Sequence, residues 1–262
     1  MVTGQSMQTW ERAEIERSSV EASLTSDVAL RMDPREMARY DAPRADTPYP
    51  LEYAYHLLGN VRGLRVVDFG CGSGANTLLL ANRGAHLWAV DISEDLIRLG
   101  ERRLAANGRA GGAQFIVASA HDLPFPPNSI DVVFGIAILH HLDLQLVSKE
   151  VQRVLRPGGR AIFKEPVRNS PVLRFARRLI PYRAPDISPY ERPLTDEELV
   201  TFAQPFGRVR TRAFCLPHVI VGERLPGVRR RVRQLYEADA AALRSLPALS
   251  YYAGVRVVEL TK

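Results

Sequence analysis

The sequence predicts an α/β fold with a doubly wound, seven-stranded, mostly parallel sheet and helices on both faces. Two observations carry this prediction. From residue 64 onward, short apolar runs rich in β-branched residues alternate with stretches of helical spacing that end at glycines. Such alternation is typical of parallel strands, and right-handed crossovers place helices on both faces. With 262 residues and 46% hydrophobic content, the chain is long enough for one large domain.

The predicted elements follow one another in order. Strands are expected at residues 64–69, 85–92, 113–119, 130–139 and 160–166, with helices over 74–84, 93–108 and 145–159 between them. Ser93 is a typical N-cap for the second of these helices, and Pro157 is expected to end the third. A last hairpin is expected where residues 209–216 pair with residues 254–260.

We expect four regions along the chain. Residues 1–60 form an N-terminal helical extension, and residues 61–166 form the ligand-binding core. Residues 167–205 are rich in proline and break the alternation, which predicts a cap inserted after the fifth strand. Residues 206–262 complete the sheet and carry a helix.

Charge and composition bound the choice of partners and compartment. No stretch approaches the roughly 20 apolar residues that span a bilayer, and the N-terminus lacks a signal-peptide pattern, so a cytoplasmic protein is expected. The net charge is +6, but the one dense basic run, residues 229–233, is too short to indicate nucleic acid. Cys71 and Cys215 provide neither a disulfide framework nor a metal cluster, so no metal is expected.

The stretch RVVDFGCGSGA places three glycines directly after a predicted strand. Gly70, Gly72 and Gly74 allow positive φ and remove side chains that would block a ligand. The stretch also fits the G-x-G-x-x-A pattern of dinucleotide-binding proteins. Asp68 at the strand end would repel a pyrophosphate and attract a cation, which favours S-adenosylmethionine over NAD. Asp91, at the end of the next strand, suits the ribose diol of either ligand.

Four stretches extend this pattern in a fixed order: VVDFGCGSGANT, AVDIS, ASAHDLPFPPNSIDVVFGIAILHHL and VQRVLRPGGRAIFKEP. Together they resemble class I S-adenosylmethionine-dependent methyltransferases. More narrowly, they are similar to the small-molecule branch that includes the ubiquinone and menaquinone C-methyltransferases. The resemblance covers residues 51–166 and implies a Rossmann-like methyltransferase fold with S-adenosylmethionine as the methyl donor.

The resemblance also implies which residues hold the donor. Those that would surround the methionine moiety are Asp68, Gly70, Cys71, Gly72 and Gly74. Asp91 would hold the ribose hydroxyls, and Ile92 would pack on the adenine face. Ile136, just past the fourth strand, would offer its backbone to the methionine end.

The adenine-edge motif departs from the family pattern. Where the family usually has an aspartate, this chain has Ser119, which is a weaker acceptor for the adenine amino group. The resemblance implies that the amide of Ala120 still reaches a ring nitrogen and that His121 flanks the ring.

Methyl transfer from a sulfonium is an in-line displacement that depends on alignment, with a base where the acceptor must lose a proton. His140 and His141 follow the fourth strand, where the acceptor should face the donor. Either one of them serves as the base, or the pair packs and orders the loop. Glu165, which ends the fifth strand, would orient or deprotonate the acceptor, or would pair with Arg168 or His140.

Polar and aromatic residues of the predicted cap are the candidates for acceptor binding. In the proline-bounded stretch DISPYERPL these are Asp186, Tyr190, Glu191 and Arg192. Tyr40 and the N-terminal helix would close the site from the other side. A structural lid without direct contacts to the acceptor explains the same residues.

The sequence therefore predicts methyl transfer to a hydrophobic small molecule, such as a quinone precursor, isoprenoid, lipid or secondary metabolite. The alternatives are an RNA or protein methyltransferase, a module that binds the nucleoside without catalysis and, more distantly, an NAD-dependent oxidoreductase. Enzymes that methylate base amino groups commonly carry an Asn/Asp-Pro-Pro-aromatic motif where this chain has GIAILHH, so nucleic acid is not the expected partner. We expect a monomer or a homodimer.

Overall fold

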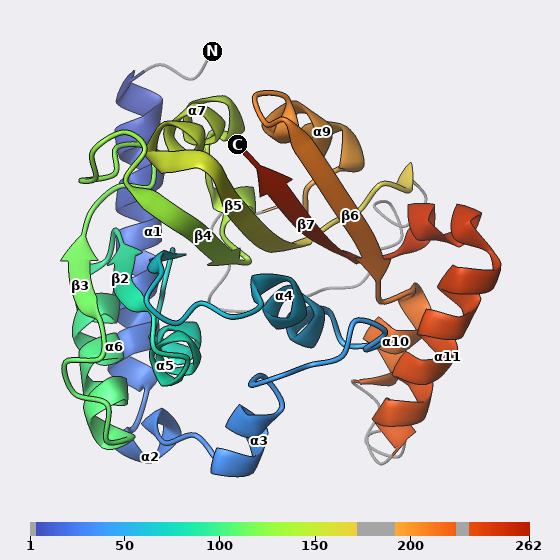
Figure 1. The fold of residues 1–262 in the computed structure, drawn as a ribbon, viewed down its shortest axis with the longest axis horizontal. Helices are drawn as coiled ribbons and strands as arrows, with labels where there is room; N and C mark the ends of the chain where they lie inside the picture. The colour runs from blue at the N-terminus through green and yellow to red at the C-terminus, as the bar shows by residue number, and fades with distance from the viewer. Residues whose placement is uncertain (1–3, 172–191, 224–230) are drawn as a thin grey trace.

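The computed structural model describes residues 4–171, 192–223 and 231–262, and its centre is a seven-stranded sheet of order β3-β2-β1-β4-β5-β7-β6 (Figure 1). The strands are β1 Arg65–Phe69, β2 His86–Asp91, β3 Gln114–Val117, β4 Ile130–Ile136, β5 Leu155–Pro166, β6 Arg208–Phe214 and β7 Val255–Thr261. Strands β1 to β5 are parallel, and β7 runs antiparallel to both β5 and β6. The predicted fold and the predicted final hairpin are confirmed.

Helices and short 3₁₀ turns connect these strands. The helices are α1 Gly4–Leu24, α2 Asp27–Leu30, α3 Pro34–Ala38, α4 Pro50–Leu58, α5 Ala75–Asn82, α6 Glu94–Ala106, α7 Leu144–Val154, α9 Asp196–Ala203, α10 Pro217–Gly222 and α11 Val232–Ser245. The 3₁₀ turns are Leu139–His141 and Pro247–Tyr252. Ser93 caps α6 as predicted, because its hydroxyl accepts a hydrogen bond from Leu96 N.

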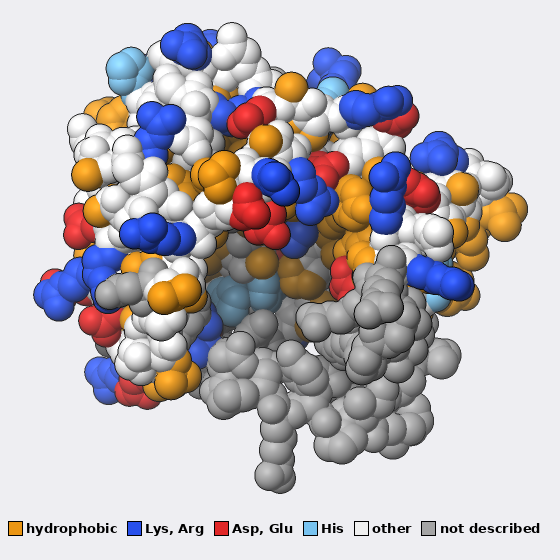
Figure 2. All heavy atoms as spheres, turned by 90° about the horizontal axis from the view of Figure 1, so that it is seen from below, with side chains coloured by type: hydrophobic (Ala, Val, Ile, Leu, Met, Phe, Trp, Pro, Cys, Tyr) orange, Lys and Arg blue, Asp and Glu red, His pale blue; other side chains and the backbone are white. Residues whose placement is uncertain are grey.

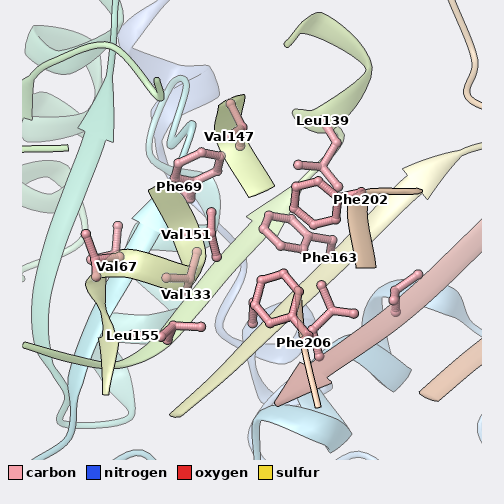
Figure 3. Packing of buried hydrophobic residues seen from close by; sticks show 14 of the residues in the cluster. Val67, Phe69, Val133, Leu139, Val147, Val151, Leu155, Phe163, Phe202 and Phe206 are labelled. Atoms are coloured by element: carbon pink, nitrogen blue, oxygen red, sulfur yellow. The ribbon is translucent and has the colours of Figure 1, made fainter. Parts of the chain in front are cut away.

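Side chains of each central strand alternate between two hydrophobic clusters, one on each face of the sheet. Val67 and Phe163 face the cluster that α7 and α9 cover, where the rings of Phe163 and Phe202 meet edge to face at 5.4 Å (Figure 3). Val66 and Ile162 face the opposite cluster, which α4, α5, α10 and α11 cover. Helix α4 therefore packs directly against the core of the sheet.

Helix α7 ends earlier than predicted. Pro157 was expected to end this helix, and the structure ends it three residues before that proline, at Val154, and begins β5 at Leu155. The physical reason is Pro157, because the residue before a proline avoids helical backbone angles and the chain must already be extended at Arg156. Gly158 then turns with φ 74° and donates its N–H to the carbonyl of Lys262.

Helix α1 lies beside α6 at the β3 edge of the sheet (Figure 1). Arg103 on α6 connects the N-terminal segment to the loop after β1. Its Nε donates to the carbonyl of Ser73 at 2.7 Å, and its Nη1 lies 3.3 Å from the carbonyls of Ala29 and Leu30. One buried guanidinium therefore holds two segments that lie far apart in the sequence.

The predicted cap falls mostly outside the described residues, which exclude 172–191. Its two flanks are joined, because Leu194 N donates to the carbonyl of Pro166 and Arg168 N donates to the carbonyl of Leu194. Within the described parts of the chain, every helix is too short or too polar to cross a bilayer.

Candidate active site

A cavity of about 330 Å³ opens where β1, β2 and β4 end and the loops after them begin. The carboxyl ends of strands in an open α/β sheet are the usual place for a ligand. Its lining residues come from five segments: Phe69 to Asn76 apart from Gly74, Val90 to Ile92 with Leu96, Ala118 to His121, Ile136 to Leu142 apart from Leu139 and His140, and Glu11, Glu14, Arg17 and Ser18 of α1. Figure 2 shows a hollow with histidine side chains inside it.

The three glycines of the loop after β1 have different roles. A Cβ on Gly70 would overlap Ile138, and one on Gly74 would lie 2.7 Å from the backbone of Gly100, so both positions require close packing without a side chain. Gly72 has φ 51°, and nothing lies within 4 Å of the place its Cβ would occupy. The space beside Gly72 therefore belongs to the cavity, where a ligand can approach the backbone.

Asp91 is the acidic residue that the structure places at this cavity. Its Oδ2 accepts a hydrogen bond from Gly72 N at 2.9 Å, and its Oδ1 accepts one from Ser93 N at 3.0 Å. Burial raises the pKa of its carboxyl, while these amides and the nearby Arg17 oppose that shift. Each oxygen still has a lone pair for the cavity, which is the arrangement that a diol can use.

Asp68 does not line the cavity, contrary to its predicted place at the methionine moiety. Its side chain is 1% exposed and accepts a hydrogen bond from Thr77 Oγ1 at 2.5 Å. Asp68 shares the strand face of Val66, which packs under α5, so its carboxylate points behind the glycine loop. Burial raises the pKa of this carboxyl to about 7, and the neighbouring Asp91 adds to the shift.

The two histidines after β4 lie in different environments. His140 is 6% exposed, and its Nδ1 lies 2.8 Å from Glu165 Oε2. Glu165 is fully buried, and its Oε1 also accepts the amides of Ile138 and Leu139 at 2.9 Å each. His141 instead lines the cavity, with its ring 4.1 Å from that of His140. The structure therefore pairs His140 with Glu165, one of the predicted alternatives, and of the two histidines it is His141 that lines the cavity.

The N-terminal helix was expected to close the site, and α1 does line the cavity, through residues that the sequence had not singled out. His141 Nδ1 lies 3.3 Å from Glu14 Oε1, and Arg17 Nε lies 3.2 Å from the other oxygen of Glu14. Ser18 lines the cavity one residue further along. The one sequence signal was the polar spacing at residues 11, 14 and 18 on a helix without an apolar stripe, which reads equally well as a solvent-exposed face.

The predicted adenine edge also lines the cavity. Ser119 Oγ donates to Glu11 Oε1 at 2.7 Å, and His121 Nδ1 lies 3.2 Å from the same hydroxyl. His121 Nε2 accepts the amide of Asp143 at 3.1 Å. Burial lowers the pKa of His121, although Glu11 and Asp143 oppose that shift. Ala120 and Ile92 lie among the lining residues as well.

The remaining predicted residues divide between the cavity and other places. Cys71 and Ile136 line the cavity, and burial raises the pKa of the Cys71 thiol well above its usual value. Tyr40 lies elsewhere, because it packs on Tyr55 at 5.1 Å between ring centres and is not among the lining residues. Arg192 forms an ion pair with Glu198 at the start of α9. Asp186, Tyr190 and Glu191 fall outside the described residues.

Comparison with known proteins adds to this geometry. Residues 67–163 match the model of a family described as a methyltransferase domain. Over these residues the chain is similar to a methyltransferase domain. The match runs from β1 to β5 and includes the glycine loop, Asp91 and the histidine pair, so the predicted class I resemblance is confirmed.

Several curated proteins are similar to part of this chain. The demethylmenaquinone methyltransferase of Clavibacter sepedonicus is 38% identical over 106 residues, which are 40% of this chain and 42% of that protein. The ubiquinone/menaquinone biosynthesis C-methyltransferase of Azotobacter vinelandii is 34% identical over 119 residues, 43% of this chain and 46% of that protein. The chain thus spans less than half the length of these curated relatives.

Solved structures of methyltransferases have a fold similar to that of this chain. A geranyl diphosphate C-methyltransferase from Streptomyces coelicolor A3(2) superposes with a TM-score of 0.54 at 15% identity, covering 79% of this chain and 78% of that one. The magnesium protoporphyrin IX methyltransferase of Synechocystis PCC 6803 superposes with a TM-score of 0.51 at 18% identity, covering 81% of each chain. The Rossmann-like methyltransferase fold is confirmed.

Proposed function

We propose that this protein transfers a methyl group from S-adenosylmethionine to a hydrophobic small molecule. The observation that carries the proposal is the cavity at Asp91 and Gly72, where a carboxylate fixed by two amides stands beside an open stretch of backbone. The relatives support the acceptor class, because their names include menaquinone and sterol methyltransferases. Two of the solved neighbours hold S-adenosylhomocysteine, the product of the same donor.

The charges of the cavity fit this donor better than a dinucleotide. Its described lining carries three carboxylates, on Glu11, Glu14 and Asp91, and one guanidinium, on Arg17. An acidic cavity attracts the sulfonium and ammonium of S-adenosylmethionine and repels the pyrophosphate of NAD. The preference for S-adenosylmethionine over NAD, which the sequence suggested on the basis of Asp68, is therefore better explained by Glu11, Glu14 and Asp91, which do line the cavity.

The residues present would hold the donor in three parts. The loop at Gly70 and Gly72 would bind the methionine end, and Asp91 would accept the ribose hydroxyls. Ile92 and Ala120 would enclose the adenine. The donor supplies an electrophilic methyl group on a sulfonium, which an acceptor nucleophile attacks in line.

The protein's own part in the reaction is alignment, exclusion of water and proton removal. Helix α1 closes the cavity from outside, so donor and acceptor would meet away from bulk water. His141 is the proposed base, because its ring lines the cavity and Glu14 can stabilise its protonated form. His140, held by Glu165, would position the ring of His141 by direct contact.

Isothermal titration tests the donor part of this proposal. The wild-type protein should bind S-adenosylhomocysteine and S-adenosylmethionine, and Asp91→Ala should weaken both by at least roughly tenfold because two ribose hydrogen bonds are lost. Binding of NAD without binding of either sulfur nucleoside would overturn the proposal.

A second experiment tests the acceptor part. Methyl-labelled S-adenosylmethionine is incubated with the protein and panels of quinone precursors, sterols, prenyl diphosphates, tRNA and peptides, and label transfer is followed by mass spectrometry. Transfer to an apolar small molecule is expected. Transfer to tRNA or peptide alone would instead favour the macromolecular alternative.

A further inference from the structure

The wall at Ser119 contains a carboxylate that comes from a different part of the chain. Ser119 stands where related domains usually carry an aspartate, and its hydroxyl donates to Glu11 Oε1 at 2.7 Å. Glu11 and Ser119 are 108 residues apart in the sequence, yet both line the cavity. A carboxylate is therefore present at this edge even though the core motif lacks one.

We propose that Glu11 recognises the donor's adenine by accepting a hydrogen bond from its 6-amino group. This inference rests on the proposed function, because it names one more contact of the same donor site. Helix α1 would then supply the residue that recognises the adenine ring, and the Ser119 hydroxyl would hold that residue in place.

The surrounding hydrogen bonds orient Glu11 for this role. His121 Nε2 accepts the amide of Asp143, so the proton of the neutral imidazole stands on Nδ1 and points toward Ser119 Oγ and Glu11. Ser119 Oγ, which also accepts the amide of His121, directs its own proton to Glu11 Oε1. Within the described residues every such contact uses Oε1, which leaves Oε2 for a ligand.

The charge pattern separates Glu11 from the next acidic residue of the helix. Glu14 is paired with Arg17 and with His141, at the end of the cavity nearer β4. Glu11 contacts the Ser119 hydroxyl and His121, whose pKa burial lowers, and within the described parts of the chain its contacts include no lysine or arginine. An ionised carboxylate only accepts hydrogen bonds, which makes it selective for an amino group over a carbonyl at the purine 6-position.

Binding of S-adenosylhomocysteine to Glu11 variants is the first test. Glu11→Ala should weaken binding roughly tenfold, as expected for one hydrogen bond to a charged group, and Glu11→Gln should weaken it less because its amide oxygen still accepts. Glu16→Ala is the matched control, since Glu16 lies on the same helix with an exposed side chain. Thermal melting without ligand shows whether each variant keeps its fold.

A change of the ligand separates base recognition from a general effect on the cavity. S-inosylhomocysteine carries a 6-carbonyl in place of the amino group. The wild-type protein should prefer S-adenosylhomocysteine by at least about tenfold, and Glu11→Ala should bring the ratio of the two dissociation constants close to one. An unchanged ratio in this variant would overturn the inference.

Moving the carboxylate back to the core gives the sharpest comparison. Ser119→Asp combined with Glu11→Ala should restore the preference for the 6-amino ligand, while Ser119→Asp alone should weaken binding and lower the melting temperature because two carboxylates then face each other. If the wild-type protein binds no S-adenosylhomocysteine, the proposed function itself fails. If it binds and the Glu11 variants match it, only the present inference fails.

Discussion

The two walls of the cavity are held in place by different forces. The wall from the sheet rests on buried groups, such as Glu165 at 0% exposure with three hydrogen-bond donors around it. The wall from α1 rests mainly on polar contacts at its surface, including Glu11 to Ser119 and Ser19 to Asp95. Buried networks are costly to break, whereas partly exposed ion pairs contribute little. The molecule therefore combines a rigid donor platform with a weakly attached cover.

The largest effect is expected at Glu165. Glu165→Ala would leave the amides of Ile138 and Leu139 and the ring of His140 without their acceptor, which should cost about 3–5 kcal/mol of unfolding free energy. Urea denaturation followed by circular dichroism measures this. Glu165→Gln keeps an acceptor oxygen and should lose clearly less. Equal loss in both variants would contradict the role given to the amide contacts.

Two glycines of one loop provide the next comparison. Gly74→Ala would place a methyl group 2.7 Å from the Gly100 backbone at φ 78°, so a loss of about 2–4 kcal/mol is expected from strain and overlap together. Gly72→Ala meets open space and should cost less stability, while it weakens S-adenosylhomocysteine binding more. Melting temperature and titration calorimetry separate the two outcomes. Similar stability losses would show that strain alone matters.

The buried carboxyl of Asp68 should make the stability of the folded protein depend on pH. Its pKa is raised to about 7 in the folded protein, from an ordinary value of 3.8, so the folded state holds a proton that the unfolded state releases. This contribution to stability is complete below pH 4 and is lost as pH rises toward 7. Asp68→Asn stays neutral and accepts from Thr77, so its melting temperature should fall less between pH 5 and pH 8 than that of the wild type. A parallel pH dependence would argue against a buried, protonated Asp68.

The smallest effect is expected on the α1 side. Glu14→Gln should change the unfolding free energy by no more than about 1 kcal/mol, because glutamine keeps the size of this largely buried side chain and can still contact Arg17 and His141. Hydrogen exchange should nevertheless become faster in residues 11–24, and added salt should act in the same direction. The amides of β1 should not change. Equal protection of α1 and β1 in both proteins would remove the distinction between the walls.

Local signals explain what the sequence could predict. The Ser93 cap depends on neighbours a few residues away, and the structure confirms it, while Asp91 ends its strand 19 residues after Gly72 and contacts the glycine loop. The predicted position of Asp68 was wrong because strand parity was not applied to it. Alternate residues of β1 face opposite clusters, so Asp68 lies on the face of Val66 and not on that of Val67.

Other parts of the site depend on contacts that no local pattern contains. The roles of Glu11 and Glu14 depend on their contacts with Ser119 and His141, which lie more than 100 residues later in the sequence. A polar helix with low apolar content is compatible with solvent on all sides, so its docking could not be predicted from periodicity. The different fates of His140 and His141 likewise depend on Glu165, which reaches the first and not the second.

The contacts of Arg103 limit the order in which parts of this molecule can fold. During synthesis the segment around Ala29 is made before α6, but the side chain that holds its carbonyl, Arg103, comes 74 residues later in the sequence. The same guanidinium holds the carbonyl of Ser73, so the loop after β1 also waits for α6. The segment at α2 can therefore reach this anchor only after β1, β2 and α6 have been made, although it precedes all three in the sequence.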